Sequence, residues 1–336
     1  MTGPARRRSR RPAIVVAVLL AACALLCAVT VLTGTYRIGA GQVLGVLTGG
    51  GSGTGRFIVL GQRLPRVTAA VLVGAALGLS GAMFQSLSRN PLGSPDIVGF
   101  TTGSATGALV ALFAGVGGLG VGAGSLLGGL ATAAVVYLFT LTGGGTGNRL
   151  ILVGIAVGAM LASVNDYLIT RADLEAAENA KTWLYGSLNA VSWPQVAPLA
   201  LALLVLVPPA LATAGPLRLM EMGDDTAAAL GVNLARTRLA VLLLGVALTG
   251  AAIAVAGPIG FMALAAPQLA RRLTRAPGIA PVAAMAMGAC LLAVADLLAQ
   301  RLLAPFQIPV GLVTGALGGA YLLWLLAADR TRPRTA

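Results

Sequence analysis

Long hydrophobic runs alternate along this chain with short polar stretches. A helix needs about 20 apolar residues to cross a bilayer, and runs of that order occupy 13–33, 64–86, 96–115, 119–141, 150–170, 195–214, 238–256, 281–302 and 309–327. A shorter apolar run, 257–270, lies between the seventh and eighth of these. Alternating segments of the kind that form outer-membrane barrels are not visible. The pattern predicts an all-α integral membrane protein, a polytopic bundle of ten transmembrane helices.

The arrangement of basic residues favours counting the short run as a span. With the N-terminus inside, ten spans place sixteen lysines and arginines in the cytoplasm and seven outside, as the positive-inside rule requires. Without the run 257–270, Arg271, Arg272 and Arg275 would face outward together with the last arginines, and the bias would disappear. We therefore predict that both termini are cytoplasmic, with basic tails at 1–12 and 328–336.

Composition supports the membrane prediction. The chain is 57% hydrophobic and 10% charged, with a mean hydropathy of +0.90, whereas soluble domains carry about 25% charged residues. So few charges cannot cover a water-facing surface. The net charge is +13. The basic residues that produce it lie between apolar runs and at the termini, as residues that orient a membrane protein do, so nucleic-acid binding is not favoured.

Catalytic and cofactor-binding patterns are missing from the sequence. There is no histidine, and the three cysteines, Cys23, Cys27 and Cys290, lie inside apolar runs without metal-ligand spacing. The glycine-rich "GGGTG" at 143–147 lacks the Lys-Ser/Thr that a phosphate-binding loop needs. We predict no enzyme activity and no bound cofactor or metal. Asp296 is the acid best placed for ion coupling, but a partner from Asn, Ser or the backbone is the simpler expectation.

One polar stretch, "MEMGDDTAAALGVNLARTR" from Met220 to Arg238, separates two apolar runs. Acids in the first turn of a helix suit its dipole, and Gly231 is a plausible stop. The order predicts a short helix, a glycine turn and a second segment at the cytoplasmic surface. This is an element that could dock a cytoplasmic partner; the alternative is an amphipathic linker.

A second stretch, "RNPLGSPDIVGF", predicts a sharp cytoplasmic turn. Pro91 and Pro95 lack backbone donors and disfavour helix before them, and Asn90 and Ser94 can cap the turns. The glycines that follow, Gly99, Gly103 and Gly107, are spaced for close helix packing. Lining or gating of a pathway is the alternative role.

Several long motifs follow one another along the chain: "RLPRVTAAVLVGAALGLSGAMFQSLSRNPLGSPDIVGFTTGS" (63–104), "WLYGSL" (183–188), "GDDTAAALGVNLARTR" (223–238), "VAGPIGFMALAAPQLARRL" (255–273), and "ADLLAQRL" followed by "IPVGLVTGALGG". Together they resemble those of one family, the FecCD-type permeases, which are membrane subunits of ABC importers for iron-siderophores, haem and vitamin B12. They occur in the family's order over residues 36–327.

This resemblance implies a single transmembrane permease domain, 13–327, in a bacterial plasma membrane. It implies alternating access that moves an iron-siderophore or similar metal chelate inward, driven by ATP-Mg in cytoplasmic ABC ATPase subunits. The other implied partners are an extracytoplasmic substrate-binding lipoprotein and a second permease subunit, identical or a paralogue. The alternative functions are an ATPase-independent secondary transporter or channel for a small solute and, more remotely, a membrane enzyme.

The resemblance also implies roles for particular residues. In the coupling segment, 216–238, the ATPase would be contacted by Gly223, Asp224, Asp225, Ala229, Leu230 and Gly231. The binding protein would dock on Arg63, Arg66 and Arg301, for which simple membrane-interface anchoring is the alternative. A weaker set for pathway or gating comprises Asn90, Pro91, Gly99, Gly103 and Asp296. In one departure from the family, Gln268 stands where a histidine is common.

Overall fold

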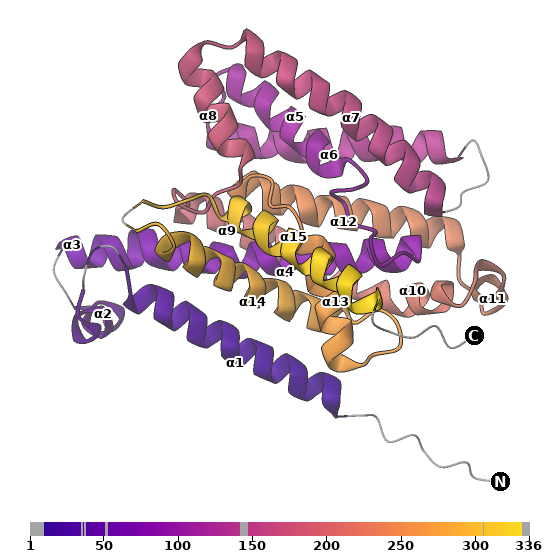
Figure 1. The fold of residues 1–336 in the computed structure, drawn as a ribbon, viewed down its shortest axis with the longest axis horizontal. Helices are drawn as coiled ribbons and strands as arrows, with labels where there is room; N and C mark the ends of the chain where they lie inside the picture. The colour runs from indigo at the N-terminus through magenta and orange to yellow at the C-terminus, as the bar shows by residue number, and fades with distance from the viewer. Residues whose placement is uncertain are drawn as a thin grey trace.

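The computed structural model describes residues 10–34, 36, 38–50, 53–141, 147–304 and 306–330, and every regular element among them is helical. Most of the two predicted tails, 1–9 and 331–336, lies outside these residues. Figure 1 shows the helices as a layered bundle. They are α1 (Arg11–Leu32), α2 (Ala40–Leu47), α3 (Gly53–Arg56), the π-helix η1 (Phe57–Arg63), α4 (Leu64–Ser88), α5 (Phe100–Phe113), α6 (Gly118–Leu141), α7 (Gly147–Arg171), α8 (Leu174–Leu184), α9 (Trp193–Ala212), α10 (Ala214–Glu221), α11 (Asp224–Ala229), α12 (Leu234–Ala256), α13 (Met262–Thr274), α14 (Pro281–Arg301) and α15 (Val310–Arg330).

Each predicted span coincides with a helix. Among the described residues, seven helical stretches are long and apolar enough to cross a membrane: α1, the continuous α3–η1–α4 stretch, α6, α7, α9, α12 and α14. The remaining three predicted spans fall on α5, α13 and α15, whose apolar parts are shorter. The all-helical membrane fold is thereby confirmed, whereas the count of ten spans stays a prediction.

Two spans begin several residues later than predicted. The run 257–270 becomes helical only at Met262, because Gly257 has a φ of +69° and Pro258 has no backbone donor. The run 96–115 becomes helical only at Phe100. In both places a non-helical segment precedes the helix, so hydrophobicity alone sets the start too early.

Two segments that lie between predicted spans contain helices. The segment 36–62 contains α2, α3 and most of η1, and its valines Val43 and Val46 are buried in a cluster with Val31, Val59 and Val67. The segment 171–194 contains α8, whose first turn is capped by the Asp173 carboxylate, which accepts from the Ala176 amide at 2.8 Å. Apolar spacing and capping within these segments therefore stabilise helices that are too short to cross a membrane.

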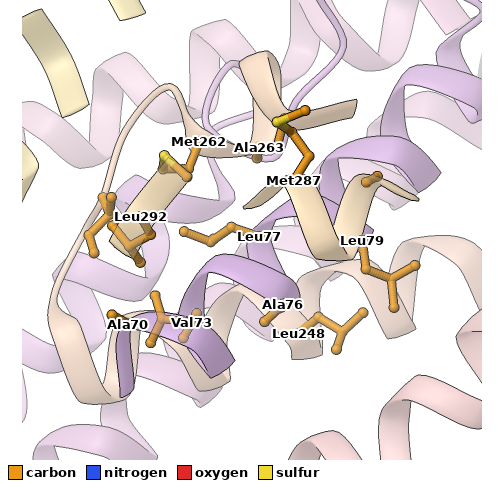
Figure 2. Close-up of a cluster of buried hydrophobic side chains, with 14 of the residues drawn as sticks. Ala70, Val73, Ala76, Leu77, Leu79, Leu248, Met262, Ala263, Met287 and Leu292 are labelled. Atoms are coloured by element: carbon orange, nitrogen blue, oxygen red, sulfur yellow. The ribbon is translucent and has the colours of Figure 1, made fainter. Parts of the chain in front are cut away.

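Helix α4 forms the centre of the bundle. Figure 2 shows its side chains packed against those of α12, α13 and α14, with labels on Ala70, Val73, Ala76, Leu77, Leu79, Leu248, Met262, Ala263, Met287 and Leu292. Glycines bring the backbones together: a Cβ on Gly74 would lie 2.3 Å from the Gly288 carbonyl oxygen, and one on Gly81 would lie 1.8 Å from the Ala263 carbonyl oxygen. Small residues at helix crossings are what holds helices together in lipid.

One end of the bundle gathers α10, α11, the start of α1 and the ends of α13 and α15 (Figure 1, right). Here the Arg11 guanidinium donates to the Leu273 carbonyl at 2.9 Å, and Arg272 lies over the Trp324 ring at 5.5 Å. Helices α2 and α3 lie at the other end. The first and last helices therefore share an end with the polar stretch 220–238. The cytoplasmic orientation of that end stays a prediction from the arginine count.

Candidate functional site

The polar stretch forms the helix and turn that its sequence predicts. Helix α11 follows Gly223, whose φ of +123° favours glycine, and carries Asp224 and Asp225 in its first turn. Gly231, with a φ of +86°, ends it. The Val232 amide then donates to the Ala227 carbonyl at 3.0 Å, which satisfies the end of the helix.

Two ion pairs tie α11 to other helices. The Asp224 carboxylate accepts from Arg89, which follows the last residue of α4, and from Arg238 in the second turn of α12. A third link joins α4 to α10, because the Ser86 hydroxyl donates to Glu221 Oε1 at 2.7 Å. Asp224 is therefore engaged within the chain, while Asp225, Ala229 and Leu230 are exposed. Leu230 is 60% exposed, an apolar side chain free to meet a partner.

The turn after α4 is held by the side chains of Asn90 and Gln268. Arg89 has a φ of +51° and ends the helix, and the Asn90 side chain accepts from the Leu92 amide at 2.9 Å, the predicted cap. The Pro91 carbonyl accepts from Gln268 Nε2 of α13 at 2.7 Å. Gln268 Oε1 in turn accepts from the Tyr321 hydroxyl of α15 at 3.2 Å. Gln268 thus joins the turn to two helices.

Gln85, in the last turn of α4, also contacts α13. Its Nε2 donates to the Leu264 carbonyl of α13 at 2.9 Å, while its buried Oε1 has no hydrogen-bond partner. The side chain is 3% exposed. Such an unpaired buried acceptor is costly.

The predicted pathway glycines are packing positions. A Cβ on Gly99, whose φ is +79°, would lie 2.7 Å from the Gly154 carbonyl oxygen of α7. A Cβ on Gly103 would lie 1.9 Å from Thr132 Oγ1 of α6. The close-packing interpretation of the glycine spacing is confirmed, and no contact here assigns these residues to a pathway.

A cleft of about 430 Å³ opens between the end of α4, α10 and the end of α13. We call it the inner cleft. Its lining is polar and rich in guanidinium and amide groups: Gln85, Arg89, Asn90, Pro91, Glu221, Gln268, Arg271, Arg272 and Gly278.

A smaller cleft of about 190 Å³, the outer cleft, lies at the other end of α4. It is lined by Gly34, Tyr36, Ile58, Gln62, Arg63, Arg66, Asn189, Gln300 and Gln307. Arg66 donates from Nη2 to Asp296 Oδ1 at 2.8 Å and from Nε to the same oxygen at 3.0 Å. Its Nη1 donates to Gln307 Oε1 at 2.6 Å, and Gln300 donates to Asp296 Oδ2 at 2.8 Å. The expectation that Asp296 would pair with Asn, Ser or the backbone is wrong, because its partners are a guanidinium and an amide.

Arg63 also has partners within the chain. It donates to the Val31 carbonyl at 2.7 Å and to the Tyr36 carbonyl at 2.6 Å. Arg63 and Arg66 are 9% and 8% exposed, whereas Arg301 is exposed. Of the three arginines predicted to dock a binding protein, only Arg301 offers its guanidinium to a partner without breaking internal contacts.

Comparison with known proteins decides the family. The model of the FecCD transport family matches residues 17–328. The chain belongs to the FecCD transport family. It is 44% identical over 322 residues, covering 96% of this chain and 98% of the relative, to the ferric enterobactin transport system permease protein FepG of Escherichia coli (strain K12). It is 38% identical to the hemin transport system permease protein HmuU of Yersinia pestis, over 81% of this chain and 84% of the relative.

A solved structure agrees with this FecCD assignment. A metal-chelate type ABC transporter in an inward-facing conformation superposes with a TM-score of 0.85 at 27% identity, covering 94% of this chain and 99% of the other. The FecCD chain is a multi-pass permease of the inner membrane. Among its described residues, no group of three or more His, Cys, Asp or Glu side chains could hold a metal ion.

Proposed function

We propose that this protein is the transmembrane permease subunit of an ATP-driven importer that moves an iron-siderophore or similar metal chelate inward by alternating access. Permeases of its family work with an ATPase and a binding protein. The relatives are permeases named for ferric enterobactin and hemin. The observation that carries the proposal is helix α11, which exposes Asp225, Ala229 and Leu230. Together with α10, it is tied to the core helix α4 through Asp224 and Glu221.

These contacts supply a route for mechanical coupling. An ATPase that moves α11 would pull on Asp224, and through Arg89 on the turn after α4. That turn meets α13 and α15 through Pro91, Gln268 and Tyr321. A displacement at the α11 end is thus passed to three helices of the bundle. Alternating access needs such a connection, because ATP would bind in another subunit.

The partners follow from this role. They are cytoplasmic ABC ATPase subunits that bind ATP-Mg, an extracytoplasmic substrate-binding lipoprotein, and a second permease subunit, either identical or a paralogue. Arg301 is the residue of this chain best exposed to receive the binding protein. No catalytic residue is assigned to the chain.

The test is uptake of a ⁵⁵Fe-labelled siderophore in cells that express the permease with its ATPase and binding protein. Leu230→Glu should abolish uptake and weaken co-purification of the ATPase, because it puts a charge in an apolar contact. Leu174→Glu is the matched control, since Leu174 is 77% exposed at the start of α8. Normal uptake in Leu230→Glu, or uptake in vesicles that lack the ATPase, would instead support the ATPase-independent transporter.

A further inference from the structure

Helix α2 has apolar side chains both where it is buried and where it is exposed. Of its eight residues, only Gln42 has a polar side chain. Val43 and Val46 are buried against neighbouring helices, whereas Leu44 and Leu47 are 59% and 48% exposed. A surface helix in water normally carries polar side chains on its exposed face. The exposed face of α2 therefore suits an apolar environment better than it suits water.

The ends of two membrane-spanning helices mark the position of α2. Its buried valines form a cluster with Val31, in the last turn of α1, and with Val59 of η1. The neighbouring Leu60 carbonyl accepts from the indole Nε1 of Trp193, the first residue of α9, at 2.7 Å. Helix α1 has 22 residues and is about 33 Å long, which matches a hydrocarbon core about 30 Å thick. Helix α2 therefore lies where α1 leaves the hydrocarbon and α9 enters it.

Helix α2 lies across the spanning helices rather than along them. Figure 1 shows α1 and α4 running along the long axis of the molecule, with α2 seen nearly end-on beside the end of α1. A helix that rests in the surface of a bilayer has this orientation. The connection from α1 to α2 is also fixed, because the Arg63 guanidinium donates to the Val31 carbonyl at 2.7 Å and to the Tyr36 carbonyl at 2.6 Å.

An exposed apolar surface on α1 reaches the end of that helix next to α2. Most residues of α1 are not buried by the rest of the chain, and Leu25, Val29 and Leu32 are exposed along its last two turns. Exposed aromatic residues lie at the same end: Tyr36 precedes α2, and Trp193 begins α9. Tyrosine and tryptophan are enriched at the boundary between membrane and water. Lipid that covers α1 therefore meets α2 at this boundary.

We propose that α2 is an interfacial helix that rests in the headgroup region of the bilayer, with Leu44 and Leu47 inserted toward the acyl chains. The arginine count places this end of the bundle outside, so the partner is the phospholipid of the outer leaflet. Removing the two leucines from water stabilises this position. Tyr36 and Arg63 line the outer cleft, and through them the anchored helix fixes one wall of that cleft against the membrane.

The test measures how close α2 lies to lipid. A bimane label is attached to the Leu44→Cys variant of the permease–ATPase complex, in nanodiscs whose phospholipid carries a nitroxide either near the headgroup or near the end of an acyl chain. The nitroxide near the headgroup should quench the label most, and iodide in the water should quench it least. Leu47→Cys should give the same order, because residues three apart share a helix face. The labelled wild type gives the background from Cys23, Cys27 and Cys290.

Two other positions calibrate the result. Leu174, which is 77% exposed at the start of α8 beside Asp173 and Glu175, should when replaced with cysteine be quenched by iodide and not by lipid. Leu20→Cys, at a position 54% exposed in the middle of α1, should be quenched most by the deep nitroxide. Co-purification of the ATPase verifies that each variant folds.

Two results would overturn the proposal. In the first, Leu44→Cys and Leu47→Cys are quenched by iodide and not by lipid, as expected of Leu174→Cys, which would place α2 in water. In the second, neither lipid nitroxide quenches them, and the loaded binding protein shields the label from iodide. That outcome would make α2 a docking surface for a protein.

Discussion

Replacing Asp224 tests whether α11 is mechanically connected to the core. Asp224→Asn removes the charge that holds Arg89 and Arg238. The three side chains are 36%, 41% and 33% exposed, and exposed ion pairs contribute about 0.2–1 kcal/mol each. Because water screens these two pairs, the free energy of unfolding should fall by no more than about 2 kcal/mol. The variant should therefore be made and assembled normally.

Transport should suffer far more than stability. If the pairs transmit ATPase movement, their loss removes a coupling free energy of about 1–3 kcal/mol, which corresponds to at least a fivefold fall in chelate imported per ATP hydrolysed. The assay is parallel measurement of uptake and ATP hydrolysis in proteoliposomes. Glu178→Gln, an exposed acid of α8, is the control.

A double-mutant cycle makes the test specific. Arg89→Gln should lower the same ratio, and the double variant Asp224→Asn, Arg89→Gln should be no worse than the poorer single variant, because both remove one link. Additive losses would show that the two residues act independently. A normal ratio of uptake to hydrolysis in Asp224→Asn would refute the proposed connection altogether.

Other variants separate packing from function. Gly81→Ala should lower the free energy of unfolding by several kcal/mol, since its Cβ would meet a backbone oxygen of α13 at 1.8 Å. Gly41→Ala is the control, because a Cβ there has nothing within 4 Å and should leave stability unchanged. Equal thermal midpoints of the two variants in detergent would contradict this expectation. Asp296→Asn should cost about 3–5 kcal/mol because it leaves the Arg66 charge buried without a counter-charge; a thermal midpoint equal to that of the wild type would contradict this. Arg301→Glu should leave the midpoint unchanged and weaken binding of the loaded binding protein, which surface plasmon resonance measures; unchanged affinity would end its docking role.

The described structure shows how far local sequence patterns reach. Helix α11, its acidic first turn and its stop at Gly231 could be predicted, because dipole, propensity and glycine conformation act within a few residues. The cap made by Asn90 was predictable for the same reason. The start of α13 was not, since both the glycine turn before it and the helix after it are apolar.

The roles of charged residues were harder to predict from the sequence than the positions of helices. Arg66 and Asp296 lie 230 residues apart in sequence, and Arg89 and Asp224 lie 135 apart. The residues flanking each arginine in the sequence do not indicate which carboxylate it pairs with. Arg66 was accordingly expected at a docking surface, and Arg89 was only one of the sixteen basic residues assigned to the cytoplasm.

The sequence by itself determined the class of this protein: a helical membrane permease with a polar surface element. Lipid requires every backbone polar group to be hydrogen-bonded within the protein, which helices and closed barrels achieve. Apolar runs of about 20 residues have the length of a spanning helix rather than of a barrel strand. Only the tertiary structure decided which arginines are paired within the chain, and that Gln268 joins the turn after α4 to α13 and α15. Those outcomes depend on how helices distant in sequence approach one another, and glycines such as Gly74 and Gly81 set that approach.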